Sequence, residues 1–251
     1  MTITMTPAEV VPKISHGEAM VLAETEFARM TGLLRQLRPE EWQRQTICPQ
    51  WDIRSMAAHV LGMAEAQASF RQFARDYRTA SKRDGGPMID AMTAAQVRER
   101  AALTPAQLVD ALTAVAPRAV RARRRVPALA RWAVRMSQDP PFDQERWRFG
   151  YLVDTIFTRD TWMHRLDTCR AAGRDMVLTA EHDGRLIADV VAEWARRHGQ
   201  PFTLVLAGPA GGRWHSGDAG DRIELDALEF CWTLAGRIPG GGGLLNTMVP
   251  F

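Results

Sequence analysis

Apolar residues recur at helical spacing through the first part of the chain. Met30, Leu33, Leu34 and Leu37 stand at offsets of 0, 3, 4 and 7, which is the spacing of a helix that buries one face. Pro39 removes a backbone donor and disfavours helical geometry in the residue before it. The pattern therefore predicts a long helix that ends before Pro39.

A second helix is predicted to begin at Asp52, because aspartate is a favoured N-cap residue. Its apolar face is formed by Ile53, Met56, Val60 and Met63. We expect this helix to continue to the turn formed by Asp84-Gly85-Gly86-Pro87.

Two further helices are predicted before residue 175. Thr104-Pro105-Ala106-Gln107 has the form of a capping box with proline at the first helical position. An arginine-rich connection with a proline covers about 121–146, and a long helix over 147–172 should end at Gly173, a left-handed C-cap. Long amphipathic helices in this number predict a four-helix bundle.

The pattern changes after Gly173. A helix is predicted over 180–198, followed by short apolar or alternating segments that indicate strands. The predicted strands are 202–206, 213–215 and 222–225, and Asp226 is expected to cap a last helix over 227–235. The fold class predicted is α+β, with a helical bundle over 1–175 and a small α/β domain over 176–251.

Composition and charge indicate a globular protein and argue against binding to nucleic acid or membrane. Hydrophobic residues make up 46% and charged residues 24% of the 251 residues, which is typical of a globular protein. A net charge of +3 and an arginine cluster at a predicted helix end, without interleaved aromatic residues, argue against nucleic-acid binding. No apolar run approaches the roughly 20 residues that span a bilayer. We expect a cytoplasmic protein that binds neither nucleic acid nor membrane.

The predicted helix over 147–172 carries the most informative side chains. Its inward stripe runs through Val153, Ile156 and Phe157 to Asp160 and His164, so an apolar face becomes polar partway along. A carboxylate that faces a bundle core is costly unless a cation or a metal neutralises it. Positions i and i+4 share one helix face. Asp160 and His164 are therefore candidate ligands of one metal ion.

A third ligand would come from the second helix. His59 lies between Met56 and Met63 on the apolar side of that helix. Two histidines and one carboxylate leave a coordination position open, as in catalytic zinc sites. The alternative is a buried histidine that hydrogen-bonds to Asp160 without any metal.

Two segments carry a family resemblance. The run Cys48-Pro49-Gln50-Trp51-Asp52-Ile53-Arg54-Ser55-Met56-Ala57-Ala58-His59-Val60-Leu61-Gly62 resembles the amino-terminal motif of the mycothiol-dependent maleylpyruvate isomerase family. Arg159-Asp160-Thr161-Trp162-Met163-His164-Arg165-Leu166-Asp167 resembles the second motif. Segments 204–214 and 234–237 are similar to the carboxy-terminal domain of that family. The resemblance implies a DinB-like four-helix bundle joined to a small, sterol-carrier-like α/β domain.

The resemblance also implies roles for single residues. It makes His59, Asp160 and His164 the ligands of zinc or another divalent metal, and Arg237 a catalytic residue that binds an anionic substrate group. One departure stands out, because the isomerases favour glutamate at the position of Asp160. The shorter side chain leaves the identity of the substrate open.

The activity implied is that of a zinc-dependent enzyme with mycothiol as thiol cosubstrate. The activated thiolate would isomerise, or be transferred to, a small electrophilic molecule. Two alternatives remain open from the residues: a non-catalytic module that binds a small molecule or lipid, and a metallohydrolase in which the metal activates water. Affinity for a thiol would distinguish the thiol-dependent enzyme from the binding module. Turnover without added thiol would indicate the metallohydrolase.

Overall fold

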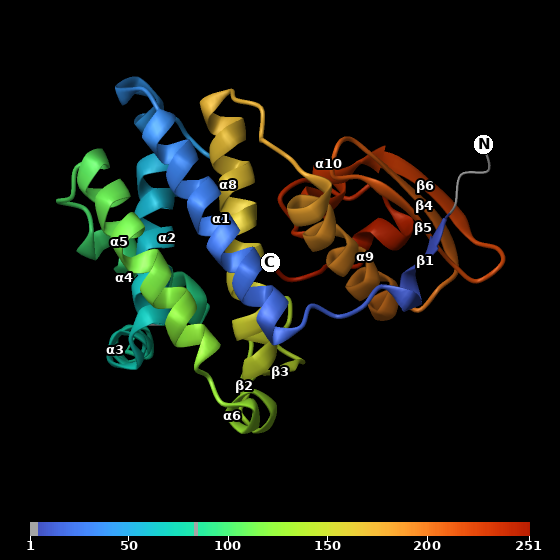
Figure 1. Ribbon diagram of the computed structural model, residues 1–251, viewed down its shortest axis with the longest axis horizontal. Helices are drawn as coiled ribbons and strands as arrows, with labels where there is room; N and C mark the ends of the chain where they lie inside the picture. The colour runs from blue at the N-terminus through green and yellow to red at the C-terminus, as the bar shows by residue number, and fades with distance from the viewer. Residues whose placement is uncertain (1–4, 83–84) are drawn as a thin grey trace. The chain divides into compact units, whose positions relative to one another are not determined.

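The computed structural model describes residues 5–82 and 85–251 (Figure 1). The chain forms two compact units. One is Ser15–Asp175, and the other combines Met176–Phe251 with the segment that ends at Ile14. Asp84, in the predicted turn after the second helix, lies outside the described residues.

The first unit is built around a bundle of long helices. These are α1 (His16–Gln36), α2 (Ile53–Ala68), α5 (Pro105–Arg124) and α8 (Phe157–Ala172), which pack side by side (Figure 1). The predicted helix boundaries are confirmed at α1, which ends before Pro39, and at the Thr104 capping box of α5. They are also confirmed at Gly173, which follows α8 with a φ of 66°.

The second predicted helix is interrupted, which corrects the expectation of one continuous helix. Ser69 has an extended backbone, with φ −147° and ψ 112°, and its side chain accepts a hydrogen bond from the Gln72 N–H. Serine therefore caps a separate helix, α3 (Phe70–Ala80), instead of continuing α2. A further helix that the sequence analysis did not predict, α4 (Met88–Glu99), packs against α2 and α3.

The connection over 121–146 and the start of the last bundle helix also differ from expectation. The connection contains α6 (Ala128–Ala133) and strand β2 (Arg135–Ser137), which pairs antiparallel with β3 (Arg146–Arg148). Trp147 therefore belongs to a strand and not to the helix predicted to begin there, because it pairs in register with Met136 of β2.

A π-helical turn precedes α8. It covers Leu152–Ile156 and follows the single turn α7 (Phe149–Tyr151). A π-helical turn inserts one extra residue into the helix and changes the direction of the side chains that flank it. The guanidinium of the buried Arg123 donates to the Val153 carbonyl, with Nε at 3.0 Å, and to the Thr158 hydroxyl at 2.9 Å. Arg123 thus holds the turn against α5.

The second unit is a small mixed sheet with helices. After a π-helical turn at Ala180–Gly184 come α9 (Arg185–His198), β4 (Phe202–Ala207), β5 (Gly212–Ser216), β6 (Asp221–Asp226) and α10 (Ala227–Leu234). Strand β4 pairs antiparallel with β5 and parallel with β6. The core is aromatic, since the Trp194 ring lies 4.8 Å from Phe202 and 5.4 Å from Phe230 between centroids.

The first described residues belong to this sheet. Strand β1 (Thr6–Pro7) pairs in parallel with β5, so the strand order is β1-β5-β4-β6. Arg185 of α9 donates to the Pro12 carbonyl at 2.8 Å. The bundle unit therefore begins at Ser15, which differs from the predicted domain over 1–175, because the segment before Ser15 finds its backbone partners in β5.

The α+β class is confirmed: a helical bundle unit and a unit with a small mixed sheet. Within residues 5–82 and 85–251, no helix combines the length and the apolar character needed to cross a bilayer.

Candidate metal centre

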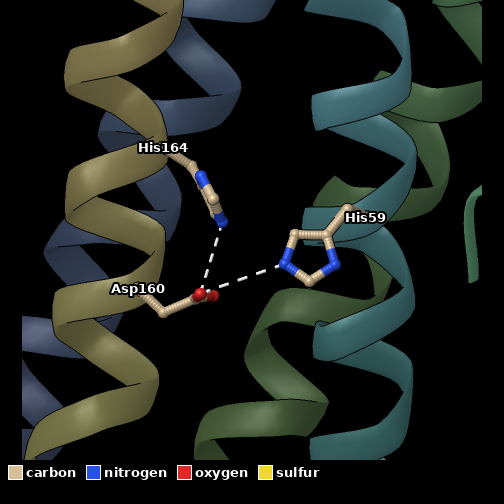
Figure 2. A group of neighbouring side chains, drawn as sticks. All are labelled: His59, Asp160 and His164. Atoms are coloured by element: carbon tan, nitrogen blue, oxygen red, sulfur yellow. Dashed lines mark ion pairs between the residues drawn. The ribbon is translucent and has the colours of Figure 1, made fainter. Parts of the chain in front are cut away.

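Three side chains from two helices meet inside the bundle unit. His59 lies on α2, and Asp160 and His164 lie one turn apart on α8 (Figure 2). Asp160 Oδ1 is 3.3 Å from His164 Nε2 and 3.9 Å from His59 Nε2. One ligand atom from each of the three residues can be chosen so that all lie within 4.8 Å of one another. The structure thus brings together the three residues that the spacing singled out.

Local sequence explains how each side chain reaches this position. The Asp52 side chain accepts from the Ser55 N–H and fixes the first turn of α2, and His59 follows two turns later on the buried face. On α8, the i, i+4 spacing places Asp160 and His164 on one face. The π-helical turn directly before α8 sets the direction in which that face points.

Burial and charge give the two histidines different proton affinities. Burial lowers the pKa of His59 more than Asp160 raises it. Burial also opposes a charge on His164, but the negative charge and hydrogen bonding of Asp160, with a contribution from Asp167, raise its pKa to about 9. Although burial by itself would raise the pKa of Asp160, the two histidines hold it well below its usual range. At neutral pH the ionised Asp160 carboxylate therefore lies between a neutral His59 imidazole and a protonated His164 imidazolium, and His164 must lose its Nε2 proton to bind a metal.

The surroundings of the three side chains hold the two rings in place. The Trp51 ring lies 4.9 Å from the His59 ring and 6.0 Å from the His164 ring between centroids. His59 Nδ1 is 3.0 Å from Gln96 Oε1, and His164 Nδ1 is 3.5 Å from the buried carboxylate of Asp167. Each imidazole thus turns Nε2 toward Asp160 and Nδ1 toward another polar side chain.

The donor set fits a divalent metal. Ligand atoms of a tetrahedral zinc ion, with bonds of about 2.0–2.1 Å, lie roughly 3.3 Å apart, close to the separations seen around Asp160 Oδ1. The second carboxylate oxygen of Asp160, Oδ2, is buried and has no hydrogen-bond partner among the described residues. A buried anionic oxygen without a partner is costly, and a cation would compensate for that cost.

Arg237, the predicted anion-binding residue, lies in the other unit. It follows α10, after Gly236 with a φ of 69°, and its backbone N–H donates to the Trp232 carbonyl at 2.9 Å. Its role stays a prediction. No disulfide links the three cysteines, all of which lie within the described residues: Cys48, Cys169 and Cys231. Burial raises the pKa of Cys169 to about 11. A raised pKa leaves that thiol protonated and unreactive.

The role of Gln96 beside His59 was not predicted from the sequence. Gln96 is buried on α4, a helix that was not predicted. The spacing of Met88, Met92 and Ala95 is helical, and it was the available signal for that helix.

Comparison with solved structures shows the fold of the chain. The crystal structure of the mycothiol-dependent maleylpyruvate isomerase has a TM-score of 0.56 and 18% sequence identity, covering 93% of this chain and 93% of that chain. The crystal structure of a histidine-to-alanine mutant of that isomerase also has a TM-score of 0.56, with 17% identity and the same coverage of 93% for both chains. At 17–18% sequence identity, this comparison shows a shared fold and nothing about activity.

Sequence comparison identifies a family for the bundle unit. No curated protein is similar enough to this chain to count as a relative. Residues 23–169, which include His59, Asp160 and His164, match the family described as the mycothiol maleylpyruvate isomerase N-terminal domain. Because this match spans more than half of the sequence, the chain belongs to that family.

Proposed function

We propose that the protein is a metal-dependent enzyme that uses a low-molecular-weight thiol, mycothiol, to act on a small electrophilic molecule. The observation that carries the proposal is the convergence of His59 Nε2 and His164 Nε2 on Asp160 Oδ1, while the buried Oδ2 of the same carboxylate has no hydrogen-bond partner among the described residues. Membership of a family named for a mycothiol-dependent isomerase supplies the thiol and the substrate class.

In this proposal the metal ligands are the Nε2 atom of each imidazole and a carboxylate oxygen of Asp160. Two neutral histidines and one carboxylate would leave a bound zinc ion with a net charge of +1 and an open position, and such an ion would supply the positive charge that favours the thiolate form of a thiol. A free alkyl thiol has a pKa near 8.5 and is mostly protonated at neutral pH. Asp167 and Gln96 hold the rings of His164 and His59, so the donor atoms need little rearrangement.

The reaction proposed is a cis–trans isomerisation of a maleylpyruvate-like substrate. The thiolate sulfur adds to one carbon of the cis double bond, and the electron pair moves onto the adjacent conjugated carbonyl. The bond that is now single rotates, and expulsion of the thiolate restores the double bond as trans. Arg237 is proposed to bind a carboxylate of the substrate. In the other reaction open to the same thiolate, its sulfur would bond to a carbon of an epoxide or an alkyl halide, and the C–O bond would open to an alkoxide or the halide ion would leave.

Metal analysis and turnover test the proposal together. Purified protein should contain about one zinc per chain, and should convert maleylpyruvate only when mycothiol is added. His59→Ala should lose both metal and turnover. His215→Ala changes a histidine of the sheet unit, on β5, and is the matched control that should keep both.

Two results would contradict this assignment. Protein that neither contains nor binds zinc would leave His59 and His164 as ordinary buried histidines. Metal-dependent turnover that needs no thiol would favour the metallohydrolase.

A further inference from the structure

The two ring nitrogens of His59 face different neighbours. Nε2 lies 3.9 Å from Asp160 Oδ1, whereas Nδ1 lies 3.0 Å from the side-chain oxygen of Gln96 on α4. Both residues are buried, with 2% of His59 and 1% of Gln96 exposed. A neutral imidazole carries a proton on only one nitrogen, so the partner of Nδ1 decides whether Nε2 offers a lone pair.

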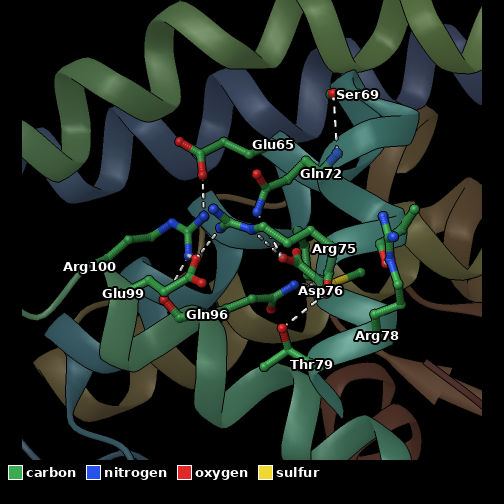
Figure 3. Close-up of polar contacts among 12 residues, drawn as sticks. Glu65, Ser69, Gln72, Arg75, Asp76, Arg78, Thr79, Gln96, Glu99 and Arg100 are labelled. Atoms are coloured by element: carbon green, nitrogen blue, oxygen red, sulfur yellow. Dashed lines mark hydrogen bonds and ion pairs between the residues drawn. The ribbon is translucent and has the colours of Figure 1, made fainter. Parts of the chain in front are cut away.

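The surroundings of Gln96 fix which end of its amide faces His59. The amide nitrogen is 3.3 Å from the sulfur of Met63, a weak acceptor. Asp76, a buried carboxylate on α3, faces Gln96 as well (Figure 3). Burial and the charge of Glu99 raise the pKa of Asp76, and the nearby Gln96 side chain counters them. The Gln96 amide nitrogen therefore faces Met63 and Asp76, and its oxygen faces His59.

Asp76 is itself held in position by neighbours on α3 and α4. Gln72 Nε2 donates to Asp76 Oδ1 at 2.8 Å, and Arg75 Nε lies 3.8 Å from the same oxygen. Arg75 also pairs with Glu99, and Arg100 pairs with Glu65 of α2 (Figure 3). These contacts tie α2, α3 and α4 together around Gln96, so its amide has little freedom to turn over.

Gly62 provides the space that Gln96 needs. It lies on α2, three residues after His59, and a Cβ there would come within 2.7 Å of Gln96 Cβ and 2.8 Å of Gln96 Cγ. Distances this short do not occur between packed carbons. The absence of a side chain at position 62 therefore lets α4 approach α2 closely enough for Gln96 to reach His59.

We propose that Gln96 is a positioning residue: it accepts the Nδ1–H of His59 and so holds the tautomer whose Nε2 lone pair points to the metal position. The inference rests on the proposed metal site. Metal-binding histidines in general donate their second N–H to a nearby acceptor, which orients the ring and raises its basicity.

Zinc affinity and the protonation of the His59 ring test the proposal. Affinity is measured by competition with a chromophoric chelator, using zinc alone as the probe. Gln96→Met removes the acceptor at nearly constant size and should weaken zinc binding by about 10- to 100-fold. The double change Asp76→Asn with Gln96→Glu exchanges amide and carboxylate, keeps an oxygen next to Nδ1, and should restore binding. Gln72→Met removes an amide that touches Asp76 but not His59, and should leave affinity unchanged.

The second measurement is independent of metal and needs no variant. Nitrogen-15 NMR of the metal-free wild type should show His59 protonated at Nδ1. Thermal unfolding without metal reports whether Gln96→Met has merely lost structure. If Gln96→Met does not fold, the tautomer of His59 in the wild type and the zinc affinity of the double variant test the proposal.

Each outcome has a distinct meaning. Weakened zinc binding by folded Gln96→Met, with rescue by the double variant, supports the inference. Unchanged affinity in folded Gln96→Met, no rescue, or a wild-type ring protonated at Nε2 overturns it and leaves the proposed function intact. Failure of the wild type to bind zinc overturns both.

Discussion

At the scale of single residues, buried charges in the bundle unit are matched by specific partners. Glu41 is 2% exposed, and its carboxylate accepts from Arg174 at 2.7 Å and from the Arg38 backbone N–H at 2.6 Å. These hydrogen bonds, that of Arg174 first, lower the pKa of Glu41 to about 2. A carboxyl group whose pKa is lowered by folding stabilises the folded state only while it is ionised.

The contribution of Glu41 to stability should therefore depend on pH. It is fully present above the ordinary pKa of 4.5 and is lost as the pH falls toward about 2. Glu41→Gln should lower the free energy of unfolding more at pH 7 than at pH 3, as measured with urea. Glu40→Gln, at an exposed surface pair with Arg38, is the control and should change it little at either pH. An equal loss for Glu41→Gln at both values would contradict this account.

Two helical glycines should respond in opposite ways to the same substitution. Alanine at Gly32 of α1 meets no heavy atom within 4 Å, so Gly32→Ala should raise the free energy of unfolding by roughly 0.5–1 kcal/mol. Alanine at Gly62 collides with Gln96, and overpacking of this kind costs about 1–3 kcal/mol. Gly62→Ala should thus lower stability. Thermal and urea unfolding of both variants provide the check, and a stabilised Gly62→Ala would refute the close approach.

The candidate site was predictable from sequence in part. The i, i+4 spacing of Asp160 and His164, and the position of His59 between two apolar residues, follow from helix geometry alone. The contact between Gln96 and His59 depends on how α4 packs on α2. No local pattern encodes that packing, although Gly62 marks the place of close approach.

At the scale of elements, the π-helical turn before α8 is the feature most closely tied to the site. It lies between β3 and the helix that carries Asp160 and His164. Arg123, with 2% of its surface exposed, binds the Val153 carbonyl inside the turn. Burial lowers the pKa of Arg123 to about 10, so it remains charged at neutral pH.

Removal of Arg123 should destabilise the bundle unit. Arg123→Met leaves the buried Val153 carbonyl without this donor, and such a loss costs about 1–3 kcal/mol. Arg124→Met is the matched control, because Arg124 forms an exposed pair with Glu24 worth less than about 1 kcal/mol. Urea unfolding of the metal-free variants measures both. If the two substitutions cost the same, Arg123 does not hold the turn.

Helix boundaries were predictable where one residue determines them. Asp52, Thr104 and Gly173 act through their own side chain or backbone, and the structure uses each as expected. The break at Ser69 was not predictable in the same way, because serine is tolerated inside helices and its capping role depends on the turn that follows.

At the scale of the whole molecule, the sheet unit is assembled from the two ends of the chain. Thr6 pairs with Trp214 and Pro7 with His215, more than 200 positions later. Ala8, in the 3₁₀ turn that follows β1, is 2% exposed. Composition and periodicity could not predict this pairing, since a two-residue strand has no recognisable pattern.

Deletion of the segment before Ser15 should affect the two units differently. Without β1, strand β5 becomes an edge strand with unpaired backbone groups. Hydrogen exchange of the Gly212–Ser216 amides should become faster, whereas that of α8 should stay as in the full chain, because all bundle helices begin after residue 15. Unchanged exchange in β5 would show that β1 contributes nothing to the sheet.

The pairing of β1 with β5 also constrains the order of events during synthesis. The ribosome releases Thr6 and Pro7 early, but Gly212–Ser216 emerges only after every helix of Ser15–Asp175 has been made. The nascent bundle can therefore fold before Thr6 and Pro7 can pair with β5. We therefore expect the sheet to be completed after the bundle, and a bulky fusion placed before Thr6 to disturb the pairing of β1 with β5 and not the bundle.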